Sequence, residues 1–284
     1  MKTALIMEGG AMRGMFTAGV LDVFMENNIS FDAAAGISAG AVFGCNFKSH
    51  QIGRAIRYNK RFSKDPRYCS IRSLIKTGDL YGADFCYREL PDELDIFDRE
   101  AFRKNPMPFY VGATDLATGK AVFYNCTDGG EKDMLWMRAS ASMPLVSHPV
   151  QVDGYMLLDG GVAEAVPYRF MESIGCDGNV MILTQPKGYR KKKGRMTFIF
   201  PLLFRGYSAF VEAMQTRHTR YNRMMEEIDA REAEGKALVI RPPEALGIPH
   251  TEDDPAELER VYRLGRAEAQ NRLAEVKRFL ASGG

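Results

Sequence analysis

The sequence has little of what would place it among disulfide-stapled, zinc-binding or nucleic-acid-binding proteins. Its 284 residues include five cysteines, an odd number, and no two are spaced as C-x-x-C, which disfavours a disulfide framework and a zinc site. The four histidines are scattered, so no metal-binding cluster is visible. The formal net charge is only +2, which is too small to indicate a nucleic-acid partner. We therefore expect reduced thiols, no metal, no cofactor and no nucleic acid.

Long apolar runs are also missing. No segment approaches the ~20 apolar residues that a membrane-spanning helix needs. The apolar run at residues 3–7 ends at Glu8 and is too short for the core of a signal peptide. The sequence therefore predicts a cytoplasmic protein. Hydrophobic residues make up 45% and charged residues 26%, which suits a globular chain with a full core. Because no repeat or clear linker interrupts the chain, we expect a single domain over residues 1–284.

The order of apolar and amphipathic segments predicts an α/β protein. The chain opens with an expected strand (residues 3–7), helix (13–27), strand (31–35) and helix (39–49). Such alternation predicts parallel strands joined by right-handed crossovers. Residues 51–105 look mostly helical, with breaks at Pro66 and Pro91. Further strands are expected at residues 109–113, 121–124, 155–158, 180–183 and 237–240, and further helices at 131–140, 206–230 and from Pro255, capped by Asp254, to near the end.

A possible nucleophile lies where the second expected strand meets the second helix. The run Gly36-Ile37-Ser38-Ala39-Gly40 matches G-x-S-x-G, in which flanking glycines allow a sharp strand-to-helix turn around a strained serine. The serine hydroxyl then projects at a helix N-terminus, where developing negative charge is favoured. The alternative is an ordinary turn rich in glycine and serine. The position of the motif between strand and helix favours a nucleophile.

A glycine-rich loop directly follows the first strand. Consecutive small residues can point backbone N–H groups into a concavity that binds an anion, such as the oxyanion of acyl transfer. The alternative is a nucleotide-phosphate loop, but the run is neither G-x-G-x-x-G nor followed by a Lys-Ser/Thr pair. The residues of this loop are Glu8, Gly9, Gly10, Ala11, Met12, Arg13 and Gly14.

Asp159 is the candidate base. It ends an expected strand and is followed by Gly160 and Gly161, which leave room for a cleft, although Asp-Gly also suits a tight turn. A serine nucleophile needs a base, and many hydrolases use histidine. The histidines that could serve here are His148, which precedes Asp159, and His218 and His250, which follow it. We interpret all three as surface residues.

Together these motifs resemble the patatin-like phospholipase family, over about residues 3–185. A small-residue segment, Ala139-Ser140-Ala141-Ser142-Met143-Pro144, matches the A-S-x-A-x-P run that the family carries before its aspartate. The resemblance implies a three-layer α/β/α sandwich with a mostly parallel sheet, followed by a helical extension over about residues 186–284. It also implies a catalytic Ser38–Asp159 dyad without histidine, acting on lipid esters. An oxyanion hole would come from Gly9, Gly10, Ala11 and Arg13, supported by Gly14, Gly36, Gly40, Gly160 and Gly161.

One residue departs from the family pattern. Ala11 stands where the family has a third glycine. A left-handed backbone there would strain an alanine, although alanine still offers its N–H. We therefore expect a less efficient oxyanion hole, not a missing one.

Two matters stay open at this point. Basic residues between positions 187 and 195 precede an apolar run at 196–204, which suits peripheral contact with a membrane surface or a solvated loop leading into a buried segment. The alternatives to the dyad are a histidine-dependent esterase of another fold and a non-enzymatic nucleotide- or anion-binding module. The oligomeric state is not predicted.

Overall fold

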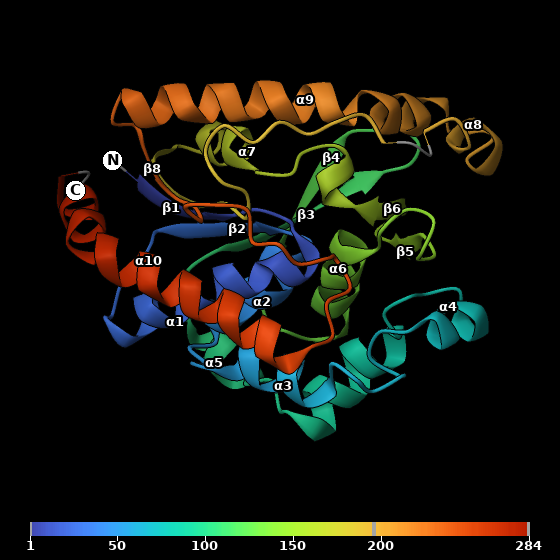
Figure 1. The fold of residues 1–284 in the computed structure, drawn as a ribbon, viewed down its shortest axis with the longest axis horizontal. Helices are drawn as coiled ribbons and strands as arrows, with labels where there is room; N and C mark the ends of the chain where they lie inside the picture. The colour runs from blue at the N-terminus through green and yellow to red at the C-terminus, as the bar shows by residue number, and fades with distance from the viewer. Residues whose placement is uncertain (1, 195–196, 283–284) are drawn as a thin grey trace.

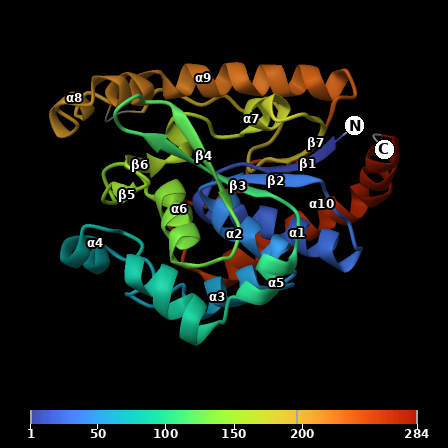
Figure 2. The ribbon, with the colours of Figure 1, turned by 180° about the vertical axis from the view of Figure 1, so that it is seen from behind.

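A central sheet organises the protein. The computed structural model describes residues 2–194 and 197–282. Within these ranges eight strands form one sheet in the order β5-β6-β3-β2-β1-β7-β8, with β4 paired to β3 (Figures 1 and 2). Strands β1, β2, β3, β7 and β8 are parallel, whereas β4, β5 and β6 join by antiparallel pairing. The strands are β1 (Lys2–Met7), β2 (Ala33–Ile37), β3 (Phe109–Asp115), β4 (Ala121–Cys126), β5 (Val150–Val152), β6 (Tyr155–Asp159), β7 (Cys176–Ile182) and β8 (Ala237–Ile240).

Helices cover both faces of the sheet, which confirms the three-layer α/β/α arrangement with a mostly parallel sheet. One face carries α7 (Tyr168–Ser173) and the long α9 (Ser208–Ala233) (Figure 1). The other face carries α1 (Gly14–Glu26), α2 (Ala39–Lys48), α6 (Glu131–Ala141) and α10 (Pro255–Ser282). The remaining helical segments are α3 (Arg54–Phe62), α4 (Ile71–Thr77), α5 (Arg99–Lys104), α8 (Phe200–Leu203), the π-helix η2 (Phe85–Leu94) and the 3-10 turns η1 (Ala11–Arg13) and η3 (Gly160–Val162).

The apolar run of β1 supplies both layers of core. Successive side chains of a strand point to opposite faces, so a strand buried on both sides is apolar throughout. Leu5 and Met7 belong to the core under α1 and α10, whereas Ala4 and Ile6 belong to the core under α7 and α9. The apolar character of this segment therefore follows from its central place in the sheet.

Some sequence predictions were shifted or wrong in detail. The strand predicted at residues 31–35 is β2, Ala33–Ile37. Phe31 precedes the strand and packs between Phe24 and Phe47, with ring centroids 6.0 and 5.9 Å away. Pro91 does not end a helix but lies inside the π-helix η2. Of the predicted basic loop and apolar run, residues 195 and 196 lie outside the described residues.

The C-terminal helix crosses the first helix at very short range. A Cβ atom on Gly19 of α1 would lie 2.1 Å from the carbonyl oxygen of Tyr262, and one on Gly265 of α10 would lie 2.0 Å from that of Phe16. The Tyr262 hydroxyl also donates a 2.6 Å hydrogen bond to the carboxylate of Asp22. The two helices therefore meet backbone to backbone, at glycines on both sides.

Replacing Gly265 by alanine should lower the melting temperature. An alanine in place of a helix glycine ordinarily stabilises by ~1 kcal/mol, so the sign of the effect is diagnostic. Here the new methyl group would meet a backbone oxygen that no side-chain rotation can move, and such overpacking costs ~1–3 kcal/mol. Thermal denaturation of Gly265→Ala measures this, with Ala267→Leu at an exposed position of the same helix as control. A raised melting temperature would contradict the close crossing.

Candidate active site

Ser38 occupies a strained turn between β2 and α2. Its backbone has φ 53° and ψ −119°, a left-handed conformation that non-glycine residues rarely adopt. The glycines of the motif allow the turn: a Cβ on Gly36 would lie 2.3 Å from the oxygen of Gly40, and one on Gly40 would lie 2.4 Å from that of Met7. Strand and helix can therefore approach only because both positions lack a side chain.

Ser140 ties the nucleophile turn to the sheet. The backbone N–H of Ser38 donates to the Ser140 hydroxyl over 2.8 Å, and that hydroxyl donates to the carbonyl of Gly112 in β3 over 2.6 Å. Two residues later, the carbonyl of Ser142 accepts the N–H of Asp159 over 2.7 Å. The small-residue segment at positions 139–144 therefore holds both candidate catalytic residues by their backbones.

Asp159 ends β6, and the fold brings it beside Ser38. Both residues are buried, with 7% of Ser38 and 6% of Asp159 exposed. Oxygen Oδ1 of Asp159 accepts the N–H of Gly161 over 2.7 Å, and the hydroxyl of Thr114 donates to the backbone oxygen of Asp159 over 2.8 Å. The Ser38 hydroxyl is a hydrogen-bonding neighbour of the same carboxylate. The carboxylate is thus held by the N–H of Gly161 and lies next to the Ser38 hydroxyl.

Burial raises the pKa of Asp159 above its ordinary value. The neighbouring cation Arg217, the Ser38 hydroxyl, the N–H of Gly161 and the cation Lys191 each act in the opposite direction on this pKa. A carboxylate with a raised pKa is a stronger base than an exposed aspartate. The environment therefore favours proton acceptance by Asp159.

The glycine-rich loop lies against Ser38, the candidate nucleophile. A Cβ on Gly9 would lie 3.1 Å from the Cβ of Ser38. The N–H of Gly9 donates to the carbonyl of Ala165 over 3.3 Å, whereas the N–H groups of Gly10 and Ala11 bond to none of the described residues. Ala11 has φ 49°, which is the left-handed conformation expected to strain an alanine at this position. The N–H groups of Gly10 and Ala11 therefore have no partner among the described residues, and the second belongs to a strained alanine.

The other loop and turn positions support this arrangement. The N–H of Arg13 donates to the carbonyl of Gly10 over 3.2 Å, which leaves only its side chain to act on a ligand. A Cβ on Gly14 would lie 2.7 Å from the Cβ of Ala39, and one on Gly160 would lie 2.4 Å from the oxygen of Gly112. These glycines are therefore needed for close packing around Ser38 and Asp159.

Several buried polar groups near the site carried no sequence signal. Glu8 accepts hydrogen bonds from the N–H of Thr184 over 2.6 Å and from the hydroxyl of Tyr221 over 2.7 Å. Arg217 of α9 donates from Nε to the carbonyl of Gly161 over 2.7 Å. Residues 184, 217 and 221 come from outside the motifs, and only the fold brings them to Glu8 and to the segment after Asp159.

No histidine of the described residues is hydrogen-bonded to Ser38 or Asp159. The His148 ring lies 3.8 Å from the carboxylate of Asp79, and His218 contacts the hydroxyl of Thr219. Partial burial and the cations around it lower the pKa of His250 to about 4, so its ring is neutral at pH 7. None of these three histidines is therefore hydrogen-bonded to Ser38 in the way that a general base would be.

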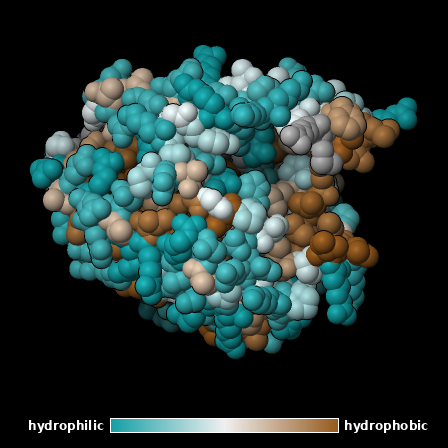
Figure 3. All heavy atoms as spheres, viewed as in Figure 1, coloured by the Kyte–Doolittle hydropathy of each residue, from teal (hydrophilic) through white to brown (hydrophobic). Residues whose placement is uncertain are grey.

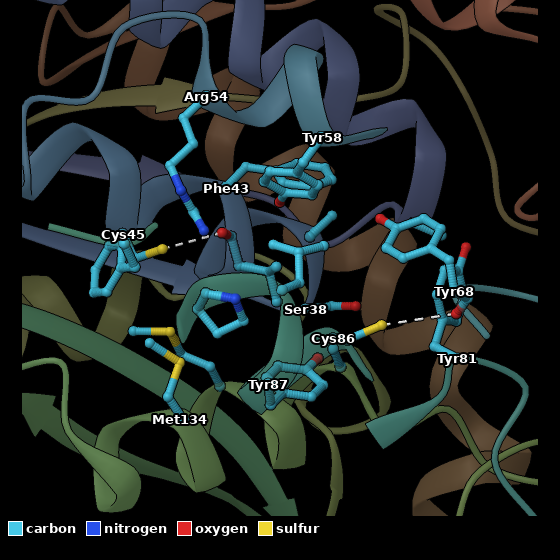
Figure 4. A pocket seen from close by; sticks show the side chains of 18 of the residues that line it. Ser38, Phe43, Cys45, Arg54, Tyr58, Tyr68, Tyr81, Cys86, Tyr87 and Met134 are labelled. Atoms are coloured by element: carbon cyan, nitrogen blue, oxygen red, sulfur yellow. Dashed lines mark hydrogen bonds between the residues drawn. The ribbon is translucent and has the colours of Figure 1, made fainter. Parts of the chain in front are cut away.

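A pocket opens from Ser38 into the protein. Its empty volume is about 850 Å³, part of it open to solvent, within the range of ligand pockets. Figure 4 shows Ser38 in the middle of the lining side chains, with Tyr68 and Tyr81 to one side and Met134 to the other. The one charged side chain of this lining, Arg54, already donates hydrogen bonds to Asn46 and to the carbonyl of Asp95. The pocket therefore suits an apolar ligand group.

Metal ligands do not gather in the part of the chain that the structure describes. Within residues 2–194 and 197–282 there is no group of three histidine, cysteine, aspartate or glutamate side chains that could hold a metal ion. All five cysteines are free thiols. None of the helices described is both long enough and apolar enough to cross a bilayer.

Comparisons with known proteins agree with these motifs. The chain is 26% identical to the uncharacterized protein YjjU of Escherichia coli, over 98% of this chain and 79% of that protein. It is 28% identical to an uncharacterized NTE family protein of Mycobacterium tuberculosis, over 64% of this chain and 48% of that one. Lysophospholipase NTE1 of Chaetomium globosum is 25% identical over 61% of this chain and 11% of its own length.

Family profiles divide the chain into two parts. Residues 207–281, which include most of α9 and α10, match a domain of unknown function (DUF6363). Residues 5–171 match the patatin-like phospholipase profile, and this match contains Ser38, the glycine-rich loop and Asp159. More than half of the chain is covered by that second match, and the chain belongs to the patatin-like phospholipase family.

Proposed function

We propose that the protein is a serine acyl hydrolase that cleaves carboxylic esters of lipids with a Ser38–Asp159 dyad. Family membership supports a lipid hydrolase, and the name of the Chaetomium relative adds lysophospholipids as candidate substrates. The observation that carries the proposal is the strained turn that sets Ser38 beside a buried carboxylate and a loop with free N–H groups. These are a nucleophile, a base and an oxyanion hole.

The chemistry follows from these positions. Asp159 accepts the proton of the Ser38 hydroxyl as Oγ attacks the ester carbonyl, and the N–H groups of Gly10 and Ala11 stabilise the oxyanion. The alcohol leaves with the proton from Asp159, and an acyl-enzyme remains on Ser38. Asp159 then takes a proton from water as the oxygen of that water attacks the acyl group. When the carboxylic acid leaves, Asp159 returns the proton to Oγ of Ser38, which restores the serine hydroxyl and the carboxylate.

The pocket beside Ser38 supports a lipid substrate. Its lining is dominated by aromatic and aliphatic side chains, including Phe43, Tyr58, Leu90 and Met137. An acyl chain buried there gains roughly 0.8 kcal/mol for each methylene group removed from water. The pocket therefore takes the acyl part of the ester, and the polar part remains outside it.

A fluorophosphonate probe tests the proposal directly. The probe reacts with activated serines, so it should label the wild-type protein and not Ser38→Ala. Single replacements of His148, His218 and His250 by alanine should leave labelling intact. Loss of labelling in one folded histidine variant would instead favour a histidine-dependent esterase. Nucleotide-induced thermal stabilisation without labelling would favour a nucleotide-binding module.

Membrane contact is the second part of the proposal. Two short apolar helices project from the walls of the site: α4 lies between the pocket residues Tyr68 and Tyr81, and α8 packs beside Val162 in the turn after Asp159. Figure 3 shows hydrophobic surface over both helices at one edge of the molecule. The exposed side chains are Ile71 (72%) and Ile75 (82%) of α4, Leu202 (78%) of α8 and Phe198 (77%) in the turn before α8. The exposed Lys192 and Lys193 precede α8 and would attract an anionic lipid surface.

Liposome co-sedimentation measures this contact. The double variant Ile75→Ser/Phe198→Ser should bind anionic vesicles about tenfold or more weakly than wild type, since burial of one such side chain is worth ~1.5–3 kcal/mol. Ile96→Ser, at a residue outside α4 and α8 that is also exposed, serves as the control. Equal pelleting of all three proteins would remove the membrane proposal and leave the dyad untouched.

A further inference from the structure

A second cavity lies beside the dyad, between the segment after Asp159 and helix α9. Its empty volume is about 640 Å³, part of it open to solvent. Residues 161–165 form one wall, and α9 forms the opposite wall with Arg217, Arg220 and Tyr221. Gly161 belongs to both sites, because it lines this cavity and donates its N–H to Asp159. Gly161 is therefore the residue that connects the cavity to the carboxylate of Asp159.

Two of the arginines that line this cavity have no ion-pair partner among the described residues. Arg169 and Arg223 each pair with Glu227, but Arg217 and Arg220 have no carboxylate within 4.0 Å among the described residues. Both instead donate to backbone carbonyls, Arg217 to Gly161 and Arg220 to Val162 and Ala213. A guanidinium offers five N–H donors, so each keeps donors for a ligand.

Two buried atoms of the cavity wall have no partner in the described residues. They are Nε of Arg220 and Oε1 of Glu164. Buried polar atoms are nearly always hydrogen-bonded, and an atom left without a partner is costly. A bound oxyanion could accept from Arg220, and a protonated Glu164 could donate to the same anion.

More cations converge on the dyad side of Arg217. Lys191 is anchored to α9 by two hydrogen bonds between its backbone and the Asn222 amide, and its ammonium group lies 4.3 Å from the centre of the Tyr221 ring. Nε of Arg13, from the oxyanion loop, is buried without a partner among the described residues. Burial and repulsion by Arg217 and Arg13 lower the pKa of Lys191 to about 7. The region therefore gathers the cationic groups of Lys191, Arg13 and Arg217 near the carboxylates of Glu8 and Asp159.

We propose that this cavity is an anion-binding subsite of the active site, in which Arg217 and Arg220 hold a phosphate or carboxylate group carried by the ester substrate. The inference rests on the proposed function. The arginine donors of the subsite belong to α9. The proposal therefore gives a role in substrate selection to the region that matches a domain of unknown function. Ser38 lines the pocket proposed for the acyl chain, whereas Gly161 lines this cavity, and the ester would extend from one to the other.

Binding of inorganic phosphate tests the site without catalysis. Phosphate should raise the melting temperature of the full-length wild type by a few degrees above chloride at equal ionic strength, because a ligand stabilises the state that binds it. Arg217→Gln and Arg220→Gln should each lose this increment, measured against their own melting temperature without phosphate. Arg278→Gln, an exposed position of α10, removes the same charge and should keep it. Equal increments in all four proteins would overturn the subsite.

Kinetics then assign the site to substrate. A lysophosphatidic acid and a monoacylglycerol with the same acyl chain differ only in the phosphate, and an acylated hydroxy acid replaces phosphate by carboxylate. The preference of the wild type for one anionic ester over the neutral one, as a ratio of kcat/KM, should fall about 10- to 100-fold in Arg217→Gln, the effect of losing a charged hydrogen-bond partner. A wild type that hydrolyses all three esters equally would overturn the assignment.

Glu164 adds a pH dependence that a purely structural arginine would not show. Burial raises the pKa of Glu164 to about 7, while the neighbouring Arg169 acts in the opposite direction. The carboxyl group is neutral below that pH and becomes a negative charge that opposes the anion above it. Sulfate, whose own charge is constant here, should therefore bind more weakly as pH rises through 7. The pKa of Lys191 is also about 7, so its positive charge is lost over the same range, and Glu164→Gln should reduce this dependence without abolishing it. The same pH dependence in Glu164→Gln would contradict the role of this residue.

The proposed function and the subsite can fail separately. Absence of fluorophosphonate labelling at Ser38 would end the dyad proposal whatever phosphate does. Labelling of Ser38 together with phosphate increments that ignore Arg217 and Arg220 would end only the subsite.

Discussion

Ser38→Ala should lose at least about a thousandfold in kcat/KM for lipid ester hydrolysis, because no other group can form the acyl-enzyme. The substitution removes a hydroxyl that makes no hydrogen bond required by the fold, and the backbone N–H of Ser38 still donates to Ser140. Alanine must keep a φ near 53°, so the melting temperature should change little. Steady-state kinetics on a panel of acyl esters measures the loss.

The control for this variant is its fold. Circular dichroism and thermal denaturation should match wild type, and binding of a non-hydrolysable lipid analogue should be retained. Hydrolysis at the wild-type rate by well-folded Ser38→Ala would contradict the assignment of Ser38 as the nucleophile.

Asp159→Asn should lose about 10²- to 10⁴-fold in kcat, the contribution of a general base. Asparagine keeps an oxygen that can accept the N–H of Gly161 but cannot take the serine proton. Since burial raises the pKa of Asp159, the ionised carboxylate destabilises the fold above that pKa, and the neutral amide removes this cost. The variant should therefore be as stable as wild type or more stable. The double variant Ser38→Ala/Asp159→Asn should be no less active than the worse single variant, because the pair acts as a unit.

The pH profile gives an independent reading of the same residue. Activity needs the ionised Asp159, so kcat/KM should fall as pH decreases through a pKa above that of an exposed aspartate. Because Arg217 lowers the pKa of Asp159, Arg217→Gln should move the acidic limb to higher pH. An acidic limb unchanged in both Asp159→Glu and Arg217→Gln would show that another group controls the profile.

Most of the strand–helix order could be predicted from the sequence because it depends on local pattern. The apolar β1 and the striped α10 appear where periodicity indicates them. The start of β2 could not be predicted, because it is set by pairing, with Ala33 opposite Ala4 in β1. The sequence pattern around Phe31 is typical of a strand, yet its side chain packs against Phe24 of α1 and Phe47 of α2.

The site divides in the same way. Ser38 and Asp159 could be proposed from the sequence because the chemistry proposed for them needs glycines at fixed spacing, and this spacing is visible in the sequence. Arg217 leaves none: it lies in a polar helical stretch that resembles any solvated helix face. Its place over Gly161 depends on how α9 crosses the end of β6, and such a contact between residues 56 apart has no local signature.

The left-handed backbone of Ala11 has a consequence for the proposed oxyanion hole. An isolated alanine disfavours this conformation, so the surrounding fold must impose it. The constraints are the close packing of Thr184 against Gly10 and the 3-10 turn that leads into α1. A loop whose shape is imposed in advance has little left to rearrange when charge appears on the carbonyl oxygen. Preorganisation of this kind lowers the reorganisation free energy of the reaction, and it implies that Ala11→Gly, although relieved of strain, should gain stability without gaining rate.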